Sequence, residues 1–194
     1  MRLTDKQILI IKTTLAIMFA VNAGENIGYV AATLSVVPFI FPFFVRSFFY
    51  LVCVLIVQWI LFSDRLPKWW FINGFIGCLI SAFLIEILLP LSSFSPPSIQ
   101  YYIVDMLRYL LVGLIAVVPQ SIFLGKQGYL WLLLNALGWA FNQIYISLLI
   151  YPIFSTVPFY IVILITATNG LPLGFMLSLY LHKVLKGQYV QNTE

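Results

Sequence analysis

Five charged side chains fall inside long apolar stretches of the chain, where an ionised group is costly and is often functional. Three are acids and two are arginines: Glu25, Glu86, Asp105, Arg46 and Arg108. A helix rises about 1.5 Å per residue, and counting from the start of each stretch puts all five near the same membrane surface. This outer polar layer predicts either a ligand or cation site or a set of structural ion pairs. The near-balance of charge favours ion pairs.

Four amide side chains form an inner polar layer toward the opposite surface: Gln58, Asn73, Gln120 and Asn135. Amides inside a membrane hydrogen-bond between helices, contributing about 0.6–2 kcal/mol each. The favoured role is to pin helix pairs together, and a polar substrate path is the alternative. Five residues near mid-depth would extend such a path: Asn142, Gln143, Thr166, Thr168 and Asn169.

Other reactive groups are scarce. The one histidine of the sequence is His182, so neither Cys53 nor Cys78 has a base beside it for nucleophilic catalysis. The sequence shows no cluster of metal-ligand residues and no glycine-rich phosphate loop. We therefore predict no catalytic residue, no metal and no cofactor, and we expect that the protein is not an enzyme.

Composition defines the elements that position these groups. Hydrophobic residues make up 62% of the 194 residues and charged residues 8%, against about 45–50% and ~25% in soluble domains. So few charges cannot cover a water-exposed surface, which excludes a soluble enzyme, a nucleic-acid-binding module and a disordered protein. We predict a single transmembrane domain over residues 1–194, with the lipid bilayer as its partner and no nucleic acid.

Six apolar stretches have the length of about 20 residues that a membrane-spanning helix needs. The expected spans are residues 7–34, 43–62, 69–89, 103–124, 129–151 and 158–182. Clusters of proline, glycine, serine and charged residues separate them. Their continuous apolar runs differ from the alternation of barrel strands. The predicted fold class is an all-α integral membrane protein with six transmembrane helices.

The basic residues indicate how these spans are oriented. With six spans, both termini and the second and fourth loops share one side, and eight basic residues lie there: Arg2, Lys6, Lys12, Arg65, Lys68, Lys126, Lys183 and Lys186. The other side holds only Arg46 and Arg108. Because cytoplasmic segments are enriched in lysine and arginine, both termini are expected in the cytoplasm. The expected location is a cell inner membrane or a thylakoid membrane.

A shift of 62 residues aligns the chain with itself. Scarce residue types coincide in four pairs: Arg46 with Arg108, Gln58 with Gln120, Trp69 with Trp131, and Asn73 with Asn135. We predict a parallel two-helix duplication, about 43–89 and 103–151, related by an axis along the membrane normal.

The repeated segment also resembles a loose class of uncharacterised polytopic membrane proteins common in cyanobacterial genomes. In that class a helix ending Gln-Trp-x-x-Leu alternates with one that begins with Trp and carries a Gly-Trp pair. Here Gln58-Trp59, Trp69-Trp70 and Gly138-Trp139 carry the resemblance, whereas Ser121 replaces the Trp expected in the second copy. The resemblance covers about the middle half of the chain and implies no activity.

The first span carries a small residue at every fourth position, which places them on one helix face: Ala16, Ala20, Gly24, Gly28 and Ala32. Small residues let another backbone approach closely. This helix-packing face therefore predicts a close contact with a helix of the same chain or of a partner membrane protein. In the last span, Gly170-x-Pro172-x-Gly174 predicts a kink, which serves packing or exposes carbonyls to a ligand.

Two functions remain open. The lack of catalytic groups, the short loops and the helix-packing face favour an integral accessory or scaffold subunit of a membrane complex. The alternative is a small transporter or substrate-capture component that uses the outer polar layer. The length, the six helices and the Ala16-x-x-x-Ala20 pair are similar to the substrate-binding components of energy-coupling vitamin transporters. An enzyme acting on lipid or peptide through the outer carboxylates ranks third.

Overall fold

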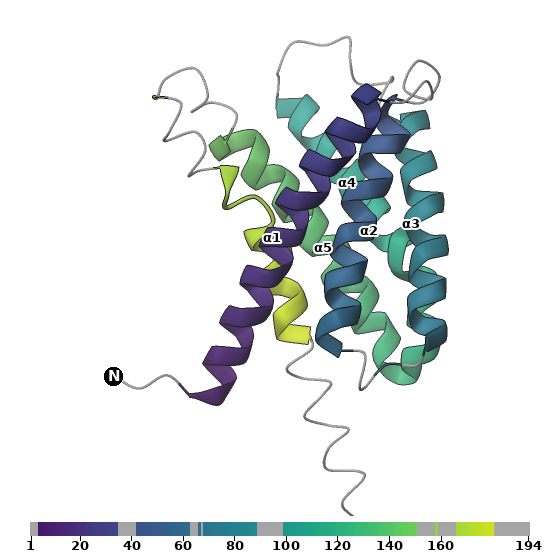
Figure 1. Ribbon diagram of the computed structural model, residues 1–194, viewed down its shortest axis with the longest axis vertical. Helices are drawn as coiled ribbons and strands as arrows, with labels where there is room; N and C mark the ends of the chain where they lie inside the picture. The colour runs from purple at the N-terminus through teal and green to yellow at the C-terminus, as the bar shows by residue number, and fades with distance from the viewer. Residues whose placement is uncertain are drawn as a thin grey trace, which may run out of the picture.

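The computed structural model describes residues 4–34, 42–62, 66, 68–88, 99–150, 158 and 166–180, which are helical apart from short turns. Five α-helices follow one another: α1 (Asp5–Leu34), α2 (Pro42–Phe62), α3 (Lys68–Leu88), α4 (Ile99–Ser121) and α5 (Gly128–Tyr145). The 3₁₀ segment η3 (Ile122–Gln127) joins α4 to α5, and the π-helical segment η4 (Ile146–Ile150) follows α5. A further helix covers Leu171–Tyr180 (Figure 1).

Four apolar helical stretches within these residues are long enough to cross a membrane: Gln7–Thr33, Phe44–Leu61, Lys68–Ile87 and Tyr102–Leu148. The last has 47 residues, or about 70 Å of straight helix, which is twice the hydrocarbon thickness of roughly 30 Å. It is not straight, because Gly125 leaves helical geometry with φ 51° and ψ −130°, a conformation that glycine adopts without strain. The stretch therefore consists of two helices, α4 and α5, which are joined by this turn and pack against each other.

The protein is thus an all-α, multi-pass membrane protein in the part that the structure describes. The first five expected spans coincide with α1 to α5, with shifts of a few residues at their ends. Pro42 begins α2, where a missing backbone N–H costs no helical hydrogen bond. Of the sixth expected span, 158–182, residues 159–165 and 181–182 lie outside the described residues, and the helix Leu171–Tyr180 within it is too short to cross a membrane. The count of six and the orientation therefore stay predictions.

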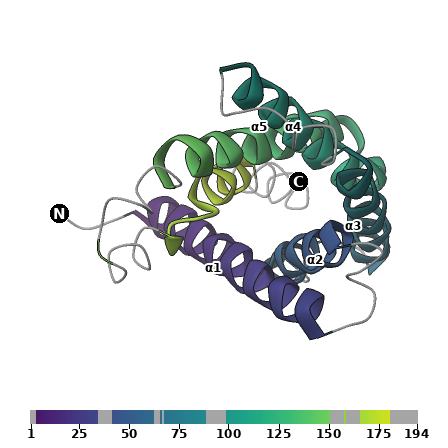
Figure 2. The same cartoon turned by 90° about the horizontal axis from the view of Figure 1, so that it is seen from above.

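The helices pack in chain order, each of α1 to α4 against the next. Seen from above they form an open arc, and the helix Leu171–Tyr180 lies between its two ends, α1 and α5 (Figure 2). On the α1 side, the Thr14 hydroxyl donates to Ser178 Oγ at 3.4 Å. On the α5 side, the rings of Trp131 and Tyr180 pack with centroids 4.9 Å apart. Residues 166–180 therefore close the arc into a ring.

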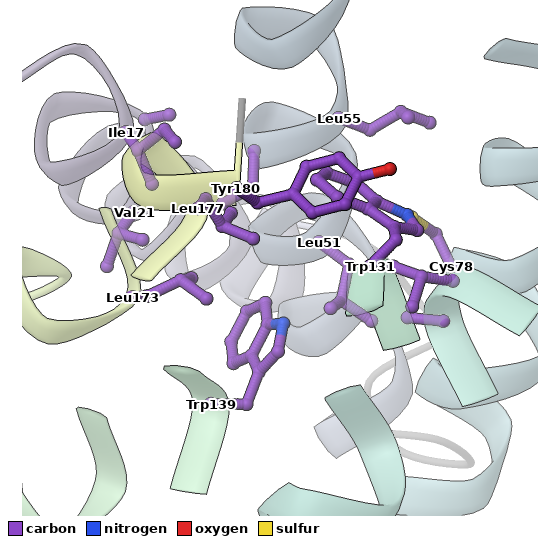
Figure 3. Close-up of a cluster of buried hydrophobic side chains, with 14 of the residues drawn as sticks. Ile17, Val21, Leu51, Leu55, Cys78, Trp131, Trp139, Leu173, Leu177 and Tyr180 are labelled. Carbon is purple, nitrogen blue, oxygen red and sulfur yellow. The ribbon is translucent and has the colours of Figure 1, made fainter. Parts of the chain in front are cut away.

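Large aromatic side chains fill the inside of this ring. Trp70, Trp131 and Tyr180 are each at most 2% exposed and lie in one apolar cluster with Leu173 and Leu177 (Figure 3). Large apolar side chains also point outward: Phe19 is 72% exposed and Ile60 is 68% exposed. Exposed apolar surface on this scale is typical of a lipid-facing protein.

The helix-packing face of α1 is used within the chain. A Cβ added at Gly24 would lie 2.8 Å from Tyr50 Cα, and one added at Gly28 would lie 2.6 Å from Arg46 O, both in α2. Along the face, Ala20, Gly24 and Gly28 are buried, while Ala16 and Ala32 are half-buried. At Gly24 and Gly28 the close contact is therefore with a helix of the same chain.

We expect Gly28→Ala to lower the thermal unfolding midpoint in detergent micelles. The added carbon meets the α2 backbone, which cannot rotate away, and overpacking of this kind costs about 1–3 kcal/mol. Each kcal/mol corresponds to roughly 2–4 °C for a chain of this size. Intrinsic tryptophan fluorescence measures the midpoint. The control is Val30→Ile, which adds one carbon to the exposed side of α1; equal midpoints for the two variants would contradict the close contact.

Candidate functional site

The outer polar layer separates into three interactions. In the first, Arg46 of α2 forms an ion pair with Glu25 of α1, and both side chains remain partly exposed. In the second, Glu86 of α3 accepts a hydrogen bond at 2.5 Å from the backbone N–H of Phe44, in the first turn of α2. The first N–H groups of a helix have no partner within it. Glu86 therefore caps α2, and it takes part in neither ion pair of the described residues.

The third interaction is buried between α4 and α5. Arg108 donates to Asp105 Oδ1 at 2.8 Å, three residues apart on α4. The second carboxylate oxygen, Oδ2, accepts from Gln143 Nε2 of α5 at 2.6 Å. Both oxygens of this carboxylate are thus engaged by protein groups.

Polar side chains also gather at residues 166–170, where the helical residue Thr166 is followed by the turn 167–170 and then by the helix Leu171–Tyr180. We call residues 166–170 the helix break. Gly170 takes φ 92°, a region that side-chain-bearing residues rarely adopt. A Cβ there would also lie 2.7 Å from Val21 Cβ of α1. The Gly170 N–H donates to Asn142 Oδ1 of α5 at 2.9 Å. This glycine therefore provides both the turn and the close approach to α1.

The carbonyls freed by the break are satisfied by a side chain. Asn22 Nδ2 of α1 donates to Ala167 O at 3.2 Å and to Asn169 O at 2.9 Å. The sequence predicted a kink at Pro172 that could present such carbonyls to a ligand. In the structure the break lies just before this proline, and its carbonyls bind the protein.

Asn169 connects the break to the charged residues. Its Nδ2 donates to Glu25 Oε2 at 2.9 Å, and its Oδ1 accepts from Asn142 Nδ2 at 3.1 Å. Glu25 therefore binds Arg46 through one carboxylate oxygen and Asn169 through the other. We call this network the polar junction; its members are Asn22, Glu25, Arg46, Asn142 and Asn169.

Two polar residues of this region, Asn22 and Tyr145, were not predicted from the sequence. Asn22 lies three residues before Glu25, on the same helix face, and that spacing was the available signal. Tyr145, whose hydroxyl contacts Thr168 Oγ1, gave no such signal, because a tyrosine near a span end is also expected as an interfacial aromatic.

The polar junction offers little chemistry beyond its own hydrogen bonds. A cation site needs several free oxygen ligands, yet both Glu25 oxygens already accept from nitrogen donors. Among the described residues, no group of three or more histidine, cysteine or carboxylate side chains could hold a metal ion. The arrangement suits the joining of α1, α2, α5 and the helix break.

The inner polar layer divides between local and interhelical bonds. Asn73 donates to Trp69 O at 2.8 Å and Asn135 donates to Trp131 O at 2.9 Å, each one turn back on its own helix. Gln120 of α4 accepts from Trp131 Nε1 of α5 at 3.2 Å. Pinning between helices is therefore seen at Gln120, and Gln58 is buried nearby on α2.

Residues that match in the predicted duplication have different surroundings. Trp69 is 64% exposed and Trp131 is 1% exposed. Arg46 is exposed and Arg108 is buried. The duplication stays a prediction.

Comparison of the chain with protein-family models, with curated proteins and with solved structures gives no match. The sequence resemblance described above therefore gains no support, and function must be inferred from the residues.

We expect Asn142→Leu to destabilise the protein, because it leaves the Gly170 N–H and Asn169 Oδ1 without their partner. An unsatisfied buried polar group costs about 1–3 kcal/mol, or roughly 2–4 °C of unfolding midpoint per kcal/mol. Asn26→Leu is the matched control, because Asn26 is exposed and, among the described residues, its side chain bonds only a carbonyl of its own helix, that of Asn22. Thermal unfolding in micelles compares the two; a smaller loss for Asn142→Leu would argue against the polar junction.

Proposed function

We propose that this chain is a non-catalytic, multi-pass membrane protein that serves as an integral accessory or scaffold subunit of a larger membrane complex. The proposal rests on the contacts that the side chains of the outer polar layer make. Each of its five charged side chains is engaged by a group of the same chain. Catalysis and transport need polar groups that can exchange their partner for a substrate.

Energetics support this role. Removing one partner from a buried ion pair costs about 3–5 kcal/mol, and Asp105 with Arg108 is such a pair. A substrate at this position would have to compensate for that loss. The Glu25–Arg46 ion pair joins α1 to α2, and the Asp105–Gln143 hydrogen bond joins α4 to α5. Such fixed contacts hold the helices in one arrangement, which a subunit with a structural role requires.

Substrate capture is the second candidate, and the polar junction is the observation that favours it. Broken helices near polar side chains are where many transporters bind substrate. In this alternative a polar substrate takes the place of Asn169 beside Glu25 and Arg46, which are partly exposed.

Native mass spectrometry after mild-detergent extraction tests the proposal. We expect the chain in a complex of fixed stoichiometry with another membrane protein. The double variant Glu25→Gln/Arg46→Gln should assemble equally well, because it removes both charges of the pair together. A chain that runs alone at its monomer mass contradicts the accessory role. Two results together favour substrate capture. The wild-type chain runs alone, and the double variant folds but no longer supports the cellular phenotype that the wild-type chain supports.

We further propose that both termini are cytoplasmic, in a bacterial inner membrane or a thylakoid membrane. In a Cys53→Ala/Cys78→Ala background, Thr4→Cys and Thr193→Cys should react with an impermeant maleimide in inverted vesicles. Ser93→Cys, in the third loop expected from the sequence, is the control and should react in right-side-out vesicles. Labelling of Thr4→Cys and Ser93→Cys from the same side would refute this orientation.

A further inference from the structure

A small cavity lies where α2, α3, α4 and α5 meet. Its volume is about 20 Å³. Three amide side chains of the inner polar layer line it, Gln58 from α2, Gln120 from α4 and Asn135 from α5. The rest of the lining is apolar: Leu51, Val54, Leu55, Gly74, Cys78, Ala116, Val117 and Trp139. A cavity needs about 10–15 Å³ and two to four polar partners to hold one water molecule.

One of these amides has a free donor group. Gln120 is 1% exposed, and its Oε1 accepts from Trp131. Its Nε2 is buried without a hydrogen-bond partner among the described residues. A Cβ added at Gly74 would collide with this nitrogen, so the glycine leaves room beside it. An unsatisfied amide costs several kcal/mol in a membrane interior, where bulk water is absent.

Two further donors are buried without partners in the described structure, Trp70 Nε1 and Tyr180 Oη. Both rings pack against Trp131, with centroid distances of 5.8 Å to Trp70 and 4.9 Å to Tyr180. Figure 3 shows Trp131 and Tyr180 beside each other, with Cys78 of the cavity wall nearby. Neither of these two donors lies on the cavity wall, which carries no charged group. Because the free polar group on that wall is the Gln120 donor, the ligand of the cavity should be a neutral acceptor.

We propose that this cavity binds a single water molecule, which accepts a hydrogen bond from Gln120 Nε2 and bonds with the amides of Gln58 and Asn135. The volume is too small for a larger polar ligand. The bound water completes the polar contact between the α2–α3 pair and the α4–α5 pair. This site is independent of the accessory role proposed above.

A double-mutant cycle tests the site. Val54→Ile adds one carbon to the cavity wall. In the wild-type background it displaces the water and leaves Gln120 Nε2 unsatisfied, so the unfolding midpoint falls by about 2–4 °C. In a Gln120→Met background the Nε2 donor is absent, so the same substitution should lower the midpoint by less. Gln120→Met also removes the acceptor of Trp131 Nε1, but that loss is present with and without Val54→Ile and cancels in the cycle. The control is Val52→Ile, on α2 but outside the cavity wall; it should have the same effect in both backgrounds.

An equal effect of Val54→Ile in the two backgrounds, whatever its sign, overturns the proposal. A second measurement keeps the wild-type side chain of Gln120. In bilayers, solid-state NMR should detect magnetisation transfer from water protons to the Gln120 side-chain nitrogen, and Val54→Ile should abolish it. Absence of this transfer in the unsubstituted protein also overturns the proposal.

Discussion

The hydrogen bonds that Asn22 and Asn142 make to the helix break are the constraint on which the ring depends. Inside a membrane, a backbone group without a partner costs several kcal/mol, so an interrupted helix must find partners within the protein. Asn22 binds two carbonyls of the break, and Asn142 binds the Gly170 N–H. These contacts allow the helix Leu171–Tyr180 to lie between α1 and α5. Tyr180 then reaches Trp131 and completes the aromatic cluster.

Close backbone approach is the second requirement, because apolar contact alone drives helices together only weakly in lipid. Helix α1 shows it on two sides. Gly24 and Gly28 admit the backbone of α2, and Gly174 lies so close to α1 that a Cβ there would be 2.7 Å from Thr14 O. Dispersion contacts at this range stabilise the packing that the polar junction orients. A charge also acts at the start of α2, where Glu86 accepts a hydrogen bond from the Phe44 N–H.

Helices α1 to α5 could be predicted because their length and apolar composition are local properties. The depth of Glu25 and Glu86 was predicted from the helical rise and stays a prediction, whereas their partners could not be predicted. Glu86 binds a backbone N–H, a group that every residue except proline has. The residue type of Phe44 therefore does not indicate that it is the partner of Glu86. The position of the helix break was also hidden. Pro172 is the second residue of the new helix, where its missing N–H breaks no bond, so the interruption falls before it.

The two segments that match in sequence show how position in the ring decides the role of a residue. The helix Leu171–Tyr180 packs on α5, so Trp131 is enclosed, whereas Trp69 on α3 stays exposed. Arg108 is buried and needs an acid within its own helix, together with the amide of Gln143 on that acid. Arg46 is exposed and can pair with Glu25 across two helices. The two tryptophans thus differ because the helix Leu171–Tyr180 packs on α5, and the two arginines differ because burial dictates how each charge must be neutralised.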